Sequence, residues 1–304
     1  MTAAPRRMSR EALGLWLGAA AMAMFGLTLP MTQIAIGDAV SPRLSPAFVT
    51  FARAVVAAGL SAALLLALRS PWPPRALWGA LAVAALGNAI AYPLGLAWAL
   101  RSVPTAHAAV VTALAPLLTA VVAAWVLRQR CSRGFWACAV AGCALVLMYS
   151  LWRAHAAGHG WALRAEDGVL ALAVLAASVG YVQGARATPV LGAERVICWV
   201  NLAALPVTLP GALLNWPAQA PEPVAWVGFA YVSVFSMWVA FFAWYRALAL
   251  GDAVRVSQVQ LLQPFFAMAF AWPLRGERIE WLSVAFAAAV MATVWLGRRL
   301  SAPR

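Results

Sequence analysis

Two stretches that begin 148 residues apart decide the fold: ALRSVPTAHAAVVTALAP at residues 99–116 and ALALGDAVRVSQVQLLQP at residues 247–264. They align without a gap, and both begin with Ala-Leu and end with Pro. Each stretch reads as the end of one helix, a very short polar turn, and a second helix that contains a proline. This shared arrangement indicates that one structural unit occurs twice in the chain.

The composition excludes a water-soluble protein. Of the 304 residues, 64% are hydrophobic and 10% are charged, whereas charged residues make up about a quarter of a soluble domain. A membrane-crossing helix takes about 20 mostly apolar residues, so about ten spans fit. The net charge of +13 is scattered between apolar runs, whereas a nucleic-acid partner would require one basic face. The four cysteines show no CxxC spacing, so neither disulfides nor a metal site is expected.

Apolar runs between charged and turn-forming residues predict ten membrane-spanning helices. The apolar run that follows Arg6 and Arg7 is longer than that of a signal peptide, so it is interpreted as the first span. The ten segments are 12–36, 46–68, 76–100, 105–127, 134–151, 168–187, 194–214, 224–248, 253–274 and 280–297. The predicted organisation is therefore a first five-helix repeat (1–151), a periplasmic connecting loop (152–167) and a second five-helix repeat (168–304).

The distribution of Arg predicts the orientation in the membrane. With the N-terminus inside, 15 of the 22 Arg residues fall in cytoplasmic segments, six fall outside, and Arg53 lies within the second span. Both termini are therefore expected to be cytoplasmic. Because five is an odd number, the second repeat enters the membrane with the opposite orientation, which is the inverted repeat of many secondary transporters.

Several short motifs resemble the drug/metabolite transporter superfamily, and within it the EamA type with ten spans in two repeats. The pair Phe25-Gly26 is similar to the aromatic-Gly start of that family's first helix, and Phe51-Ala52-Arg53 to the start of its second. The segment from Pro264 to Gly276-Glu277 is similar to its fourth helix, whereas the first repeat has Arg128-Gln129 in place of Gly-Glu. The resemblance implies an all-helical carrier of metabolites or drugs with a central cavity between the repeats.

Ionisable groups inside a membrane are expensive and suggest function. All nine carboxylates fall at or beyond the ends of the expected spans, so no buried acid is expected as a proton relay or as a partner for a cationic drug. Two candidates for a charge partner remain, Arg53 and His107. Arg53 could bind a substrate carboxylate or extend to the membrane surface. His107 could titrate near neutral pH or cap its helix.

Neutral polar and aromatic side chains supply the other candidates for substrate binding. Ser257, Gln260 and Pro264, with Gln263 nearby, fall on one helix face, where the polar side chains could line a cavity or form interhelical hydrogen bonds. Asn88 and Tyr92 share a face of the third span, and an aromatic stripe in the eighth could stack on a ligand or simply pack. The full predicted set is Thr28, Gln33, Asn88, Tyr92, Tyr181, Trp238, Phe241, Tyr245, Ser257, Gln260 and Gln263.

Two further features concern movement and packing. Pro116 and Pro264 occupy matched positions in the two repeats, and we interpret them as gating hinges. Gly180 and Gly184 form a GxxxG pattern that favours close helix packing, with or without dimerisation.

No HExxH, P-loop or GxSxG motif occurs, so no enzymatic machinery and no cofactor are expected. The sequence predicts a monomeric carrier in a bacterial inner membrane that exports small metabolites, foremost amino acids, by alternating access. The absence of a buried acid favours a facilitated or weakly coupled mechanism over strict proton antiport. Efflux of lipophilic cations and a non-transporting scaffold or sensor are the alternatives, and the only partners expected are the substrate and the lipid bilayer.

Overall fold

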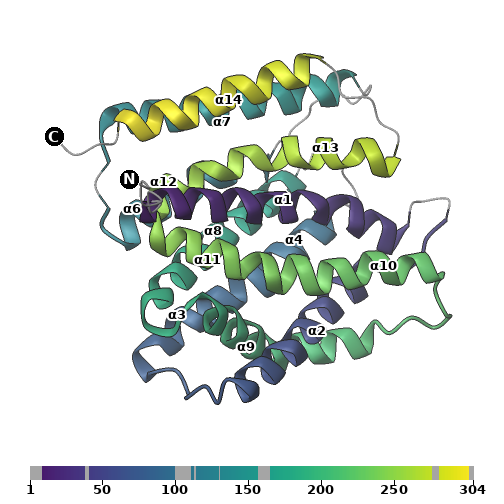
Figure 1. Cartoon of the computed structure of the whole chain (residues 1–304). Coiled ribbons are helices and arrows are strands. Elements are labelled where there is room, and N and C mark those ends of the chain that lie inside the picture. Colours follow the sequence, from purple (N-terminus) through teal and green to yellow (C-terminus); the bar gives the residue numbers. More distant parts are fainter. Residues whose placement is uncertain are drawn as a thin grey trace, which may run out of the picture.

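A computed structural model describes residues 9–37, 41–99, 111–112, 114–129, 131–156, 165–275 and 281–300. These residues form a bundle of helices (Figure 1). His107, one of the predicted charge partners, lies outside them.

In the first half of the chain, each of the five predicted spans contains at least one helix. The third span consists of two α-helices with a π-helix between them, and Ser45 caps the second span by accepting a hydrogen bond from the Phe48 amide. The bounds are α1 Arg10–Ile36, α2 Pro46–Ala67, α3 Arg75–Ala85, η1 Leu86–Ala91, α4 Tyr92–Ala99, α6 Ala115–Val126 and α7 Arg133–Ala156.

The second half repeats this order. Its third span is again divided by a π-helix, and its fourth span is divided by a short 3₁₀-helix. The bounds are α8 Ala165–Leu191, α9 Ala193–Leu214, α10 Pro223–Tyr231, η2 Val232–Val239, α11 Ala240–Leu250, α12 Ala253–Ser257, η3 Gln258–Leu262, α13 Gln263–Arg275 and α14 Trp281–Leu300. The expectation of an all-α membrane protein is confirmed, while ten spans and cytoplasmic termini stay predictions.

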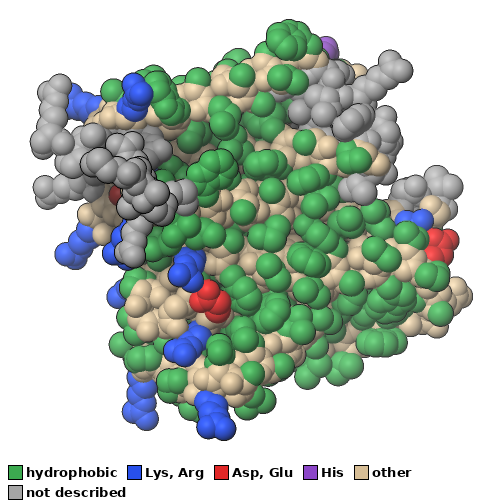
Figure 2. Space-filling model, viewed as in Figure 1, with side chains coloured by type: hydrophobic (Ala, Val, Ile, Leu, Met, Phe, Trp, Pro, Cys, Tyr) green, Lys and Arg blue, Asp and Glu red, His purple; other side chains and the backbone are tan. Residues whose placement is uncertain are grey.

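The helices have the length and surface of membrane spans. Seven continuous helical segments are long and apolar enough to cross a bilayer, and Ala115–Val126 and Val284–Gly297 are shorter apolar helices. Figure 2 shows hydrophobic side chains across the middle of one face, with charged side chains gathered toward its two ends. This is the surface expected of a protein surrounded by lipid.

Helices of the two halves pack against each other throughout the bundle. α2 packs along α9, α1 packs against α10, α11 and α13, and α8 packs against α3, α4 and α6. α7 and α14 lie side by side along one edge (top of Figure 1), where the Ser132 hydroxyl donates a hydrogen bond to the Leu300 carbonyl at 2.7 Å. The interior is therefore built jointly by both halves.

The two π-helices occur at equivalent positions. At the end of η1 the Tyr92 amide donates to the Gly87 carbonyl, and at the end of η2 the Ala240 amide donates to the Phe235 carbonyl. The two donors, Tyr92 and Ala240, are 148 residues apart, and so are the two acceptors, Gly87 and Phe235. This is the same offset as that of the two aligned stretches. π-Turns inside α-helices occur frequently at functional sites.

Candidate functional site

Polar residues from both halves meet inside the bundle. The Asn88 side-chain amide in η1 donates a hydrogen bond of 2.9 Å to the Tyr245 hydroxyl in α11. Both residues are buried, with 3% of Asn88 and 0% of Tyr245 exposed. Together with Arg53, Tyr92 and Tyr181, which are described next, they form what we call the central polar cluster.

Arg53 is the cationic member of this cluster. It lies in α2 and is partly buried, and its Nη2 is 3.7 Å from the Met237 sulfur in η2. The guanidinium interacts electrostatically with Tyr92 and Tyr181. Its Nε is buried without a hydrogen-bond partner in the described part of the chain. Arg53 therefore has a hydrogen-bond donor that no described side chain or backbone group accepts.

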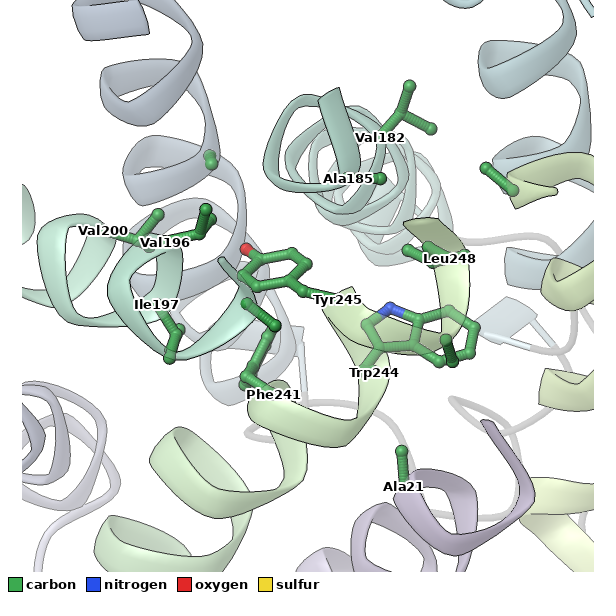
Figure 3. Close-up of a cluster of buried hydrophobic side chains, with 14 of the residues drawn as sticks. Ala21, Val182, Ala185, Val196, Ile197, Val200, Phe241, Trp244, Tyr245 and Leu248 are labelled. Atoms are coloured by element: carbon green, nitrogen blue, oxygen red, sulfur yellow. The ribbon is translucent and has the colours of Figure 1, made fainter. Parts of the chain in front are cut away.

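Aromatic rings from α11 pack against the cluster. Figure 3 shows Phe241, Trp244 and Tyr245 extending from α11 among buried side chains of α8 and α9. The Tyr181 ring lies 5.7 Å from Trp244 and 6.0 Å from Phe241. Trp238, the first residue of the predicted stripe, instead packs on Phe242 at 4.9 Å. The predicted stripe is therefore divided: Tyr245 belongs to the cluster, Phe241 packs on Tyr181 and Tyr245, and Trp238 packs on Phe242.

Two glycines of α8 make this packing possible. A Cβ atom at Gly180 would lie 2.7 Å from the Asn88 side-chain oxygen, and one at Gly184 would overlap the Tyr245 ring. Distances this short are not tolerated between carbon and a fixed neighbour. The GxxxG pattern of Gly180 and Gly184 therefore serves close packing within the chain.

A second polar contact between the halves lies in α1. The Thr28 hydroxyl donates to the Ser236 hydroxyl of η2 at 2.8 Å. Ser236 follows Asn88 by 148 residues, so equivalent positions of the two π-helices both carry a polar side chain that bonds across the halves. Gln33, the other candidate in α1, is partly buried near the end of that helix.

Two of the three polar residues predicted in the ninth span, Ser257 and Gln260, donate hydrogen bonds to nearby backbone carbonyls. The Ser257 hydroxyl donates to the Val254 carbonyl at 2.6 Å, and the Gln260 amide donates to the Ser257 carbonyl at 3.2 Å. Ser257 and Gln260 are buried, and Gln263 is partly buried. Among the described residues no hydrogen bond or ring contact joins these three to the central polar cluster.

The matched prolines begin helices. Pro116 is the second residue of α6, and Pro264 is the second residue of α13, which follows the 3₁₀-helix η3. In the first turn of an α-helix the missing amide hydrogen of proline removes no bond within that helix. Each proline therefore marks a break at the same place in its repeat.

A group of charged side chains lies at the N-terminal ends of α1 and α12. Arg255 is 3.8 Å from Glu11 and 3.8 Å from Asp252, and Asp252 accepts a hydrogen bond of 3.3 Å from the Val254 amide. Burial raises the pKa of the Asp252 carboxyl, an effect that the charge of Arg255 partly offsets. Asp252 also has a positive φ of 69°.

A pocket of about 340 Å³ lies between η1, α4 and α8. It is lined by Ala91, Gly95, Val169, Leu172, Ala173 and Ala176. Its lining is apolar and contains none of the predicted site residues, so it offers shape but no specific polar recognition.

Comparison with known proteins identifies the family of the chain. Residues 12–151 and 166–297 each match the EamA-like transporter family. The chain belongs to this family. The two matches cover both halves of the chain, and the predicted family resemblance is confirmed.

Relatives agree with this assignment to the EamA family. The chain is 34% identical over 296 residues to a protein named uncharacterized transporter YdeK from Bacillus subtilis, covering 97% of this chain and all of that one. A solved structure titled "Crystal structure of protein" shares the fold with a TM-score of 0.75 at 20% identity, over 95% of this chain and 99% of that one. The chain is therefore a multi-pass membrane transporter and not an enzyme.

Three residues of this EamA site were missed from the sequence. Ser236 was identifiable, because it aligns with Asn88 at the offset of 148 residues. Met237 and the fully buried Trp244 gave no such signal, because hydropathy treats them like any other apolar residue of a span. Their roles depend on which way each side chain points after the π-turn in η2.

Proposed function

We propose that this EamA protein exports small polar metabolites, foremost amino acids, across a bacterial inner membrane. The two repeats would move against each other by alternating access, which exposes a binding site between them first to one side and then to the other. The proposal combines the established transporter family with the chemistry of the side chains at the boundary between the repeats.

One observation carries the proposal: the central polar cluster draws its members from both repeats. Arg53, Asn88 and Tyr92 come from the first half, whereas Tyr181 and Tyr245 come from the second. A rocking motion between repeats would change the distances within such a cluster. Groups so placed can bind a substrate in one arrangement and release it in another.

The residues of the cluster suit small polar molecules. Tyrosine hydroxyls and the Asn88 amide donate and accept hydrogen bonds, while Phe241 and Trp244 add apolar surface. The acidic residues that the structure describes all lie at helix N-caps or in first turns, so none of them is placed inside a span to bind a cationic drug. This supports metabolites over lipophilic cations.

Counterflow into proteoliposomes tests the function directly. Vesicles preloaded with an unlabelled amino acid are mixed with the labelled one, with and without a pH gradient. We expect accumulation of label for at least one amino acid without a gradient, as a facilitated carrier gives. Uptake of tetraphenylphosphonium in place of amino acids would support cation efflux, and no flux of any compound by folded, inserted protein would support a scaffold or sensor.

A further inference from the structure

Arg53 has an unusual environment for a charge inside a membrane protein. Its side chain is only partly exposed, its Nε is buried without a hydrogen-bond partner, and the described contact of Nη2 is a methionine sulfur at 3.7 Å. An ionised side chain in such surroundings is costly unless another group compensates its charge.

No acidic side chain in the described ranges compensates this charge. Glu11, Glu166, Asp167, Glu194, Glu222 and Asp252 lie at helix N-caps or in first turns. Those with recorded ion pairs bind other arginines: Glu222 binds Arg43, Glu194 binds Arg246, and Glu11 and Asp252 bind Arg255. The described protein thus supplies a cation in its interior and no anion beside it.

Two tyrosines that interact with Arg53 can add to an anion site. Tyr92 and Tyr181 are close enough to interact electrostatically with the guanidinium, and each carries a hydroxyl that can donate a hydrogen bond. Arg53, Tyr92 and Tyr181 all keep partly exposed surface, whereas Asn88 and Tyr245 are buried. The three side chains that would contact a ligand are therefore the accessible ones.

We propose that Arg53, with the hydroxyls of Tyr92 and Tyr181, binds a carboxylate group of the transported molecule. This inference rests on the proposed function and sharpens it, because it states which group of the substrate is recognised. A guanidinium presents paired donors that match the two oxygens of a carboxylate. The substrate class is then carboxylate-bearing molecules, and esters, amides and organic cations of the same shape are excluded.

The first experiment compares matched compounds in wild-type proteoliposomes. The probes are phenylalanine, its amide, which lacks the carboxylate, and 3-phenylpropanoate, which lacks the ammonium group. We expect uptake of phenylalanine or 3-phenylpropanoate to exceed that of the amide by at least about tenfold, the effect of about 1.4 kcal/mol of binding free energy. Equal uptake of the amide would overturn the proposal.

The second experiment uses Arg53→Gln and the matched control Arg246→Gln. Arg246 lies in an exposed pair with Glu194 and outside the central polar cluster. Arg53→Gln should lower carboxylate uptake at least about tenfold, Arg53→Lys should restore part of it, and Arg246→Gln should leave it unchanged. Wild-type uptake in Arg53→Gln would overturn the proposal.

Thermal unfolding of the purified protein separates a binding role from a structural one. Because ligand-free Arg53 is an uncompensated charge, Arg53→Gln should melt at or above the wild-type temperature without ligand. It should also lose the stabilisation that millimolar benzoate gives to the wild type. A large fall in melting temperature together with unchanged stabilisation by benzoate would show a structural role.

The same measurement distinguishes failure of this inference from failure of the proposed function. If no amino acid is transported but benzoate stabilises the wild type and not Arg53→Gln, amino-acid export is wrong and the carboxylate site stands. If benzoate stabilises neither protein, or both equally, the carboxylate site is wrong even where amino acids are transported.

Discussion

Asn88 and Tyr245 join the third helix of one repeat to the third helix of the other through a hydrogen bond of 2.9 Å. Asn88 lies in the π-helix η1, and Tyr245 lies six residues after the end of η2. The bond therefore connects the two helices that carry the π-turns. It places a polar contact between the repeats within the π-helix of one third span and six residues past the π-helix of the other.

Removal of this bond gives the first prediction. Asn88→Ala should destabilise the protein by about 1–3 kcal/mol, because it leaves the buried Tyr245 hydroxyl without its donor. The double variant with Tyr245→Phe should be less destabilised than the sum of the single variants by about 0.6 kcal/mol, the average for such bonds in membranes, and by no more than about 1.7 kcal/mol. Unfolding in denaturant with detergent measures all four proteins, and strictly additive effects would contradict a direct bond.

Close packing at α8 gives the second prediction. Gly184→Ala should destabilise the protein by about 1–3 kcal/mol, because the new methyl group would overlap the Tyr245 ring. The control is Gly59→Ala in α2, where a Cβ atom meets nothing within 4 Å. That variant should be neutral or stabilised by up to about 1 kcal/mol through better helix propensity. Thermal unfolding of both variants checks the contrast.

The ionic group around Arg255 gives a prediction of pH dependence. The raised pKa of Asp252 means that its ionised form is disfavoured in the folded state, so this carboxyl reduces stability once the pH exceeds its folded pKa. Asp252→Asn keeps an oxygen that can accept the Val254 amide and tolerates a positive φ. The variant should therefore melt a few °C above the wild type at neutral pH, and the difference should vanish as the pH falls below the ordinary range of aspartate. A difference that grows on acidification would contradict this account.

The matched prolines give a prediction about rate. Because Pro116 and Pro264 begin helices, replacement of either by Ala should cost no more than about 1 kcal/mol of stability. If they act as hinges, exchange transport should slow several-fold while substrate affinity stays unchanged. Pro210→Ala, at an exposed position of α9, serves as the control. Unchanged transport rates in the Pro116→Ala and Pro264→Ala variants would show that these prolines have only a structural role.

The spans could be predicted from the sequence because the membrane imposes a simple rule. A bilayer requires long apolar helices, so the run from Pro46 to Ala67 is recognisable by composition alone. The family could be predicted because the repeat leaves marks such as the two aligned stretches. Both inferences depend on properties that many residues share, so an error in interpreting one residue does not change them.

The site was harder to predict because it depends on the direction of single side chains. Trp238, Phe241 and Tyr245 share one face of an ideal helix, but Trp238 lies within η2, where the turn is wider, and its ring packs elsewhere. Ser257 and Gln260 were predicted either to line a cavity or to bond between helices, and in the described structure both donate hydrogen bonds to nearby backbone carbonyls. Hydropathy and spacing carry no information about such local choices.

The paired π-helices also bear on the ancestry of the chain. A π-turn takes one residue more than the α-turn it replaces, so each repeat carries the equivalent of a single extra residue in its third helix. Because both lie at the same register, one insertion in an ancestral five-helix protein explains them, whereas independent origins would require the same event twice. On this account the irregular turn is older than the duplication, and both halves inherited it.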